Sequence, residues 1–162
     1  MTDNSEISQM VIAIGEILRA STIYRTSTTI PLEEELHFVY YYNYLQRMRF
    51  EDKIKVIQTI DPGIEHCLIP CFCIQSLIEN AYVHGLEPKP SDGTLEITIK
   101  KSENFLSITV ADDGVGFETI PSFLLDSPVA ESKSDTVHSH PQVGLKNLNR
   151  RLYLMYGEES QL

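Results

Sequence analysis

The chain has few basic residues. Only 13 lysines and arginines stand against 23 aspartates and glutamates, and the formal net charge is -10. A field of this sign repels polyphosphate, so a nucleic-acid or anionic-membrane surface is disfavoured and any phosphate site must be local. The sequence also lacks a run of about 18 apolar residues that could cross a bilayer, and residues 1–9 lack the basic start and apolar core of a signal peptide. We therefore expect a soluble chain.

Cysteine is scarce as well. The three cysteines are Cys67, Cys71 and Cys73, and His66 precedes the first. A metal site is one interpretation, but Cys71 and Cys73 are two residues apart in a segment expected to be helical. That spacing points their side chains roughly 200° apart around the axis, which prevents them from sharing one ion. We favour small buried side chains in a reducing compartment.

The length and composition are those of one ordinary globular domain. The 162 residues are 42% apolar and 22% charged, which is enough for a single sizeable core, and no internal repeat is present.

Two helices are predicted in the first third of the chain. Residues 5–19 place apolar side chains at helical spacing, namely Ile7, Val11, Ile14 and Leu18. After Pro31, the acids at 33–35 fill the first turn of a second helix, where the dipole favours negative charge. One face of this helix would carry Leu32, Leu36 and Val39, and its four tyrosines are expected to pack against neighbours rather than stack on a ligand.

The remaining elements alternate in type. Residues 53–60 alternate polar and apolar side chains and predict a strand, and a third helix follows from about Pro70 to His84, with Gly85 as its stop. Two further alternating runs, 94–100 and 105–112, predict a hairpin. Residues 118–142 are irregular, as in a lid or binding loop, and a last helix runs from Gly144 to Tyr156. Helices around at least three strands predict an α+β two-layer sandwich.

The third helix carries polar residues on one side. Ser76, Asn80 and His84 recur every four residues, so Asn80 and His84 project side by side. An asparagine inside a helix carries a propensity cost, which is explained if its carbonyl oxygen holds a hard cation. Solvent exposure explains this residue equally well when the helix is considered alone.

The stretch ADDGVGF follows directly on the second strand of the hairpin. Asp112 and Asp113 occupy successive strand positions, so one faces into the domain and the other away. A carboxylate only accepts hydrogen bonds, which suits an exocyclic amine such as that of adenine. Gly114 and Gly116 allow the backbone to approach a planar ligand. The alternative is an acidic tight turn, since Asp-Gly turns are common.

The stretch HPQVGLKNLNRRL places Gly144 at a helix start, where unpaired backbone amides and the helix dipole favour an anion. Lys146 and Arg150 lie four apart on one face and add positive charge. We expect phosphate there. The alternative is a basic helix end that faces acidic neighbours.

The order and spacing of these motifs carry a family resemblance. The chain resembles the Bergerat-fold ATP site of the GHKL superfamily and, within it, the ATP-binding catalytic domain of LytS/YpdA-type sensor histidine kinases. The resemblance extends over nearly the whole chain and is carried by four stretches, LEEELHFVYYYNYLQRMRFEDKI, IPCFCIQSLIENAYVHG, ADDGVGF and VGLKNLNRRLYLMYG. The resemblance implies an α/β sandwich of the Bergerat type with an N-terminal helical segment.

The resemblance also implies roles for matching residues. Asn80 would coordinate the Mg²⁺ that bridges the phosphates of ATP, with Glu79 and His84 as further catalytic residues near the same phosphates. Asp112 would read adenine, and Gly114 and Gly116 would form the wall of its pocket. The last helix would supply the other cofactor-binding residues, Gly144, Leu145, Lys146, Asn147 and Arg150.

The activity implied by the resemblance is that of a protein-histidine kinase, which transfers the γ-phosphoryl group of Mg-ATP to a histidine outside this chain. ATPases of the superfamily place a glutamate base where this chain has Ser76, so we expect slow hydrolysis. The alternative is a degenerate nucleotide-sensing or protein-interaction module. Gln142, which stands where the family usually has glycine, and the short C-terminus favour that alternative.

The resemblance further implies how the chain is divided. Residues 1–50 would be a remnant of the dimerisation and phosphoacceptor region, and residues 51–162 an ATP-binding catalytic domain with its lid at about 118–142 and its C-terminus truncated. The implied partners are the phosphoacceptor His domain of the same kinase and a cognate response regulator. The whole protein would be a membrane-anchored bacterial homodimer, with this part in the cytoplasm.

Overall fold

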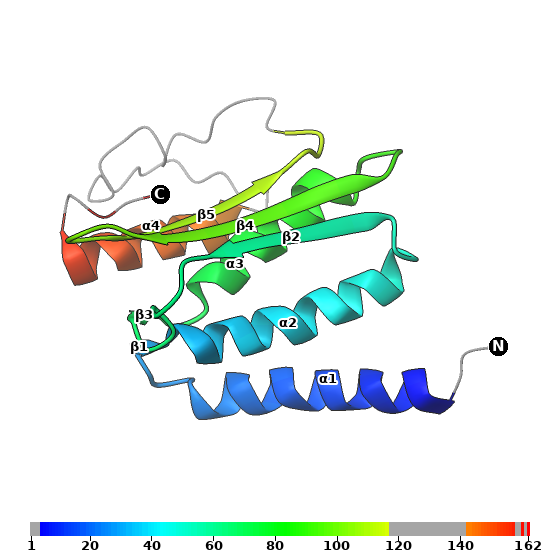
Figure 1. The fold of residues 1–162 in the computed structure, drawn as a ribbon, viewed down its shortest axis with the longest axis horizontal. Helices are drawn as coiled ribbons and strands as arrows, with labels where there is room; N and C mark the ends of the chain where they lie inside the picture. The colour runs from blue at the N-terminus through cyan, green and yellow to red at the C-terminus, as the bar shows by residue number, and fades with distance from the viewer. Residues whose placement is uncertain (1–3, 117–141, 158–159, 161) are drawn as a thin grey trace.

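The computed structural model describes residues 4–116, 142–157, 160 and 162. This part of the chain is α+β, with a layer of helices on a small sheet and an N-terminal helical segment beside them (Figure 1). The predicted fold class, a two-layer α/β sandwich, is confirmed. The described elements in chain order are α1 (Asn4–Ile23), β1 (Thr29–Pro31), α2 (Leu32–Arg49), β2 (Ile54–Ile60), β3 (Leu68–Pro70), α3 (Cys73–Asn80), the π-helix η1 (Ala81–Leu86), β4 (Gly93–Lys101), β5 (Leu106–Asp112) and α4 (Gln142–Tyr156).

The larger sheet has the strand order β2-β4-β5. Strands β4 and β5 form the predicted antiparallel hairpin, in which Leu95 pairs with Asp112. Strand β2 is parallel to β4, because the chain crosses over through α3 and η1 between them. On β4 the side chains of Leu95, Ile97 and Ile99 are fully buried and alternate with more exposed residues, so one face of the sheet forms the core.

Helix α2 belongs to the same hydrophobic core as the sheet. Leu32 and Val39 are fully buried there with Ile74 and Ile78 of α3, and Leu36 packs on them half-buried, as the sequence predicted. A short antiparallel pair, β1 with β3, adds a second link between the N-terminal segment and the rest. These contacts cross the predicted domain boundary at residue 50, and the division at that residue stays a prediction.

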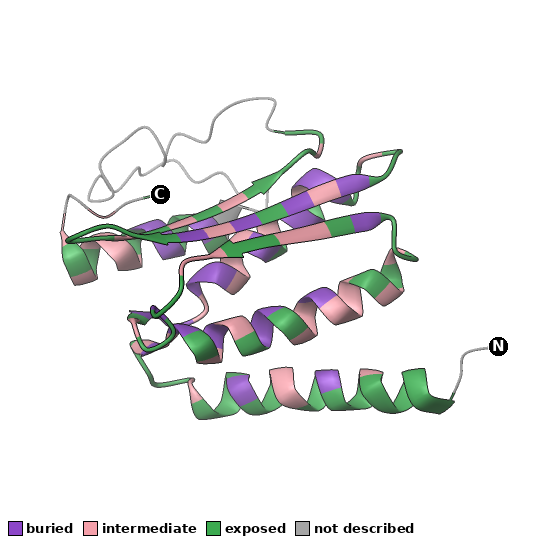
Figure 2. Cartoon of the chain, in the orientation of Figure 1, coloured by how far each residue is buried: buried purple, intermediate pink, exposed green. Residues whose placement is uncertain are grey.

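Helix α1 contacts the rest of the chain through a different face from the apolar stripe that its sequence shows. It packs on α2 through small side chains, and Ala13 and Ala20 are its buried residues. The predicted apolar stripe faces outward instead, as the largely exposed colouring of α1 in Figure 2 shows, with exposed fractions of 48% for Ile7, 64% for Val11, 46% for Ile14 and 61% for Leu18. Small residues allow two helices to approach closely, which leaves the larger ones on the far side.

Two of the four tyrosines of α2 contact other elements, as expected. Tyr42 makes an edge contact with Tyr82 at 5.9 Å between ring centroids, and the hydroxyl of Tyr44 donates to Gln9 of α1 at 3.0 Å. Tyr41 lies against His37 of the same helix at 4.9 Å between ring centroids. Tyr40 is 62% exposed.

The third helix starts later and ends later than the sequence predicts. Pro70 lies in β3, where pairing with β1 competes with helix formation, and α3 begins at Cys73 after Phe72 adopts a left-handed backbone with φ 59°. Cys71 therefore precedes the helix, and the argument about its angle to Cys73 does not apply. Both thiols are buried as expected, and burial raises the pKa of Cys73 to about 12. Gly85 does not stop the helix but lies inside η1.

No group of three or more His, Cys, Asp or Glu side chains that could hold a metal ion occurs among the described residues. None of the helices described is both long and apolar enough to span a bilayer.

Helix α4 begins at Gln142, two residues earlier than predicted, so Gly144 lies within its first turn.

Candidate nucleotide site

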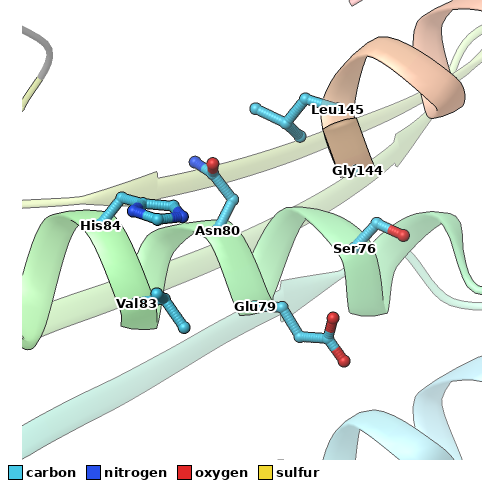
Figure 3. A pocket seen from close by; sticks show the side chains of 7 residues that line it. All are labelled: Ser76, Glu79, Asn80, Val83, His84, Gly144 and Leu145. Atoms are coloured by element: carbon cyan, nitrogen blue, oxygen red, sulfur yellow. The ribbon is translucent and has the colours of Figure 1, made fainter. Parts of the chain in front are cut away.

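A cavity of about 210 Å³ opens between α3, η1 and α4. Figure 3 shows its lining, which consists of Ser76, Glu79, Asn80, Val83, His84, Gly144 and Leu145. The cavity therefore brings together predicted site residues from two stretches that are far apart in the sequence. These are Asn80, Glu79 and His84 from one helix and Gly144 and Leu145 from the other.

Asn80 and His84 lie on one side of their helix, where Asn80 points toward Leu145 of α4 and the ring of His84 extends toward Asn80 (Figure 3). Both side chains are half-buried. Asn80 is the last residue of α3, and His84 lies in the wider turns of η1, a helix form that occurs frequently at functional sites. The predicted side-by-side arrangement is therefore present, although the helix geometry changes between the two residues.

Glu79 is exposed and projects from the other side of α3 in the same view (Figure 3). Its Oε1 accepts a hydrogen bond from Nε2 of Gln75, one turn earlier, at 2.9 Å. This bond fixes the direction of the carboxylate relative to the first turn of α3.

Helix α4 contributes an open glycine position and a buried leucine. A Cβ atom on Gly144 would meet no heavy atom within 4 Å, so the backbone here faces open space, whereas Leu145 is buried. A second cavity of about 290 Å³ shares Ser76 and Gly144 with the first and is further lined by Asn147, Leu148 and Arg151. Lys146 and Arg150 are exposed and line neither of these two cavities.

The ADDGVGF loop reaches the site by packing against η1. A Cβ atom on Gly114 would lie 2.2 Å from the carbonyl carbon and oxygen of Gly85, and one on Gly85 would lie 2.1 Å from Oδ1 of Asp112. The N–H of Val115 donates to the carbonyl oxygen of Gly85 at 3.0 Å. Gly85 and Gly114 therefore allow two backbones to touch, and the glycine predicted to end the third helix serves this close approach instead.

The two aspartates of the loop face different partners. Asp113 accepts from the N–H of Thr94 at 2.7 Å and pairs with Lys89 at 2.9 Å, and the Lys89 ammonium keeps the pKa of Asp113 below its usual value. Asp112 is exposed, its Oδ1 accepts from the N–H of Gly114 at 2.9 Å, and it lies against Gly85. The predicted adenine reader therefore lies beside η1, just beyond His84, and does not line the cavity of Asn80.

Gly116 has a positive φ of 69° and an open surrounding. The predicted lid, residues 118–142, lies outside the described residues except for Gln142, so its role stays a prediction.

A buried carboxylate that the sequence did not single out holds the start of α3. Glu35 of α2 is fully buried, and its Oε2 and Oε1 accept from the N–H groups of Phe72 at 2.7 Å and Gln75 at 3.1 Å. Burial raises the pKa of Glu35 to about 6, while these amides and the charge of Arg151 on α4 oppose the rise. Nε of Arg151 is itself buried and has no hydrogen-bond partner among the described residues.

Sequence reasoning placed Glu35 with two neighbouring acids in the first turn of the second helix, where the dipole favours negative charge, and did not predict that any of them is buried. Glu33 fits that description, since it is exposed and pairs with His66 at 3.2 Å. The available signal for Glu35 was its spacing of three and four residues from Leu32 and Val39, which puts it on the buried face of α2.

Comparisons with known proteins agree with the motifs. A family model described as "Histidine kinase" matches residues 1–54. The chain is similar to "Sensor histidine kinase YesM" of Bacillus subtilis, 35% identical over 94% of this chain and 24% of that protein. It is also similar to "Sensor protein LytS" of Staphylococcus haemolyticus, 29% identical over 99% of this chain and 26% of that protein. "Sensor histidine kinase YpdA" of Escherichia coli is 31% identical over 93% of this chain and 25% of its own length. The chain thus spans about a quarter of the length of these relatives.

Proposed function

Because the chain belongs to the LytS/YpdA-type family of sensor histidine kinases, we propose that it is the ATP-binding catalytic domain of such a kinase. In this proposal it transfers the γ-phosphoryl group of Mg-ATP to a histidine outside the chain. The observation that carries the proposal is the convergence of three distant motifs. Asn80 and His84 share a cavity with Gly144, and the loop of Asp112 touches the same helix at Gly85.

The chemistry of the loop fits a purine. The carboxylate of Asp112 can accept a hydrogen bond from an exocyclic amine, and a base that lacks this amine has no donor to offer. The backbones of Gly85 and Gly114 lie so close that there is no room for a Cβ atom between them. This contact places the end of β5 directly against η1. Asp112 would therefore be fixed in position by backbone packing rather than by its own side-chain partners.

The chemistry of the cavity fits a magnesium-bound phosphate chain. Magnesium prefers oxygen ligands, keeps several waters and is usually bound through one or two side chains together with substrate phosphates. The amide oxygen of Asn80 is such a ligand, and the described residues offer no three-acid cluster that could bind the ion without nucleotide. We therefore expect magnesium to bind here only together with a triphosphate.

The protein's contribution to catalysis would be position and charge. ATP supplies the phosphoryl group, and the first-turn amides of α4 near Gly144 favour the negative charge of phosphate oxygens. Lys146 and Arg150 add positive charge on the same helix. Ser76 lines the cavity where a hydrolytic base would stand, and its hydroxyl donates to the carbonyl oxygen of Phe72 at 2.7 Å, so we expect little activation of water.

The partners follow from the family and from α1. A histidine-bearing domain of the same kinase would receive the phosphoryl group, and a cognate response regulator would receive it next. The outward stripe of α1 repeats at spacings of four, three and four residues, the pattern of a helix-pairing seam, which supports a homodimer of the membrane-anchored whole protein. The net charge of -10 gives no support for a nucleic-acid partner.

Calorimetric titration with a non-hydrolysable ATP analogue and Mg²⁺ tests the nucleotide site. We expect the wild type to bind and the affinity of Asp112→Asn to be at least about tenfold lower. In this variant the amide oxygen can keep the hydrogen bond from Gly114, and the amide NH₂ would then face the exocyclic amine of adenine, so that two donors meet. Asp113→Asn is the matched control, since Asp113 is engaged by Lys89 and Thr94, and it should bind as the wild type does. Absence of binding, or equal losses in both variants, would contradict the proposal.

Phosphoryl transfer is tested separately. The chain is mixed with a histidine-bearing helical domain of a related kinase and γ-labelled ATP, and label is expected on histidine. Nucleotide binding without any labelled histidine would favour the alternative, a nucleotide-sensing module that acts by contacting a partner.

A further inference from the structure

Helix α3 has no N-terminal cap of its own. The residue before it, Phe72, has a left-handed backbone and no side chain that bonds to the first turn. The first amides of a helix must nevertheless find acceptors when they are buried. Glu35 supplies them from a different helix, since one carboxylate oxygen accepts from Phe72 and the other from Gln75.

The capped turn is joined to the cavity by further hydrogen bonds. The hydroxyl and the N–H of Ser76 both donate to the carbonyl oxygen of Phe72, at 2.7 and 3.1 Å, and Ser76 lines both cavities. Gln75, which Glu35 holds by its backbone, donates through its side chain to Glu79 in the cavity wall. A single carboxylate of α2 thereby holds the turn that carries Ser76, which lines both cavities, and Gln75, which bonds to Glu79.

We propose that Glu35 is a positioning residue for the phosphate end of the nucleotide site, which it controls by capping α3 from α2. This inference rests on the proposed function, because it assigns Glu35 to the site that would bind the magnesium triphosphate. Glu35 is not among the lining residues of either cavity and would act through Phe72 and Gln75. The base end of the site is held by a different contact, that of Gly85 with Gly114, at the opposite end of the same helix.

The inference is tested by comparing the affinity for a triphosphate analogue, which uses both ends of the proposed site, with the affinity for adenosine, which uses only the base end. Glu35→Gln keeps the size of the side chain but turns one acceptor into a donor that faces a backbone N–H. We expect its affinity for the Mg²⁺ complex of a non-hydrolysable ATP analogue to fall about tenfold, the effect of one lost charged hydrogen bond. Its affinity for adenosine, which has no phosphate, should change less than about twofold. Glu33→Gln, an exposed acid two residues earlier in the same turn, is the matched control and should leave both affinities unchanged.

A second measurement needs no variant and covers the case in which Glu35→Gln does not fold. Coupling between two sites is reciprocal, so a nucleotide that needs the capped turn must also stabilise it. Amide hydrogen exchange of Phe72 and Gln75 in the wild type should therefore slow several-fold when the Mg²⁺ nucleotide is added. Unchanged exchange at these two amides on binding would overturn the inference.

The outcomes separate this inference from the function on which it rests. A wild-type chain that binds no Mg²⁺ nucleotide removes the proposed function and the inference with it. A wild-type chain that binds, together with a Glu35→Gln variant that binds equally well, overturns the inference alone. An equal fall for the triphosphate analogue and for adenosine also overturns it, because this would show general destabilisation rather than positioning.

Discussion

The contact of Gly114 with Gly85 makes the sharpest prediction about stability. In Gly114→Ala the new Cβ would lie 2.2 Å from the carbonyl carbon and oxygen of Gly85 and 2.4 Å from its Cα. Nonbonded carbon atoms rest about 3.5 Å apart, so the two backbones must separate by roughly 1.3 Å. No side-chain rotation can relieve this overlap, since every atom involved belongs to the backbone.

The expected cost of Gly114→Ala has two parts. Overpacking at a rigid site costs about 1–3 kcal/mol. Separation of the backbones also weakens the hydrogen bond from Val115 to Gly85, which is worth about 1 kcal/mol. The sum, about 2–4 kcal/mol, would lower the midpoint of thermal unfolding by roughly 4–16 °C in a chain of this size.

Urea unfolding followed by circular dichroism measures this cost. Gly15→Ala is the matched control, because a Cβ there meets no heavy atom within 4 Å and the residue lies inside α1, where alanine should stabilise by up to about 1 kcal/mol. Gly85→Ala gives an intermediate case, since its Cβ meets the side chain of Asp112, which can rotate away. If Gly114→Ala proved as stable as the wild type, the two backbones would not be in contact and the reasoning would fail.

Two further predictions concern Glu35 and α1. Burial raises the pKa of Glu35 from 4.5 to about 6, so the folded chain binds this proton more tightly than the unfolded chain does. The protonated Glu35 side chain therefore stabilises the fold fully below about pH 4.5, and this stabilisation is lost as the pH rises through about 6. The unfolding free energy of the wild type, compared with that of Glu35→Gln, should fall by about 2 kcal/mol over this range. Urea unfolding at a series of pH values checks this, and a difference independent of pH would contradict it. For the proposed homodimer paired through the α1 stripe, aspartate at both Val11 and Leu18 should abolish dimers in light scattering, whereas Ile12→Asp, also exposed but off the stripe, should not. Equal effects would argue against the seam.

The elements that the sequence predicted well are those with local signals. Alternation defines β2 and the hairpin of β4 and β5, and four-residue spacing places Asn80 beside His84. Both patterns depend only on neighbours along the chain. The family motifs added the expectation that the third helix meets α4, and five predicted site residues do line one cavity there.

The features that escaped prediction depend on partners far along the chain. Gly85 follows a helical pattern, so local reasoning predicts a helix stop there. Its close backbone contact is with Gly114, which lies after the hairpin of β4 and β5 and cannot be inferred from neighbouring residues. The three glutamates at 33–35 look alike in the sequence, and only the packing of α2 on α3 buries one of them. The apolar stripe of α1 likewise predicts a buried face, whereas Ala13 and Ala20 make the contact because small side chains allow close approach.

The continuous helix of α3 and η1 is held at both ends by segments remote in sequence. Glu35 holds its first turn, and the loop after β5 holds its last turn through Gly85. Asn80 and His84 lie between these two attachments, at the point where the regular α-helix becomes a π-helix. We therefore expect changes in α2 to affect mainly the phosphate end of the proposed site, and changes in the loop after β5 to affect mainly the base end. The hydrogen-bond ladder of this helix changes after Asn80, between the two attachments, so we expect any bending of the helix to occur there rather than within α3.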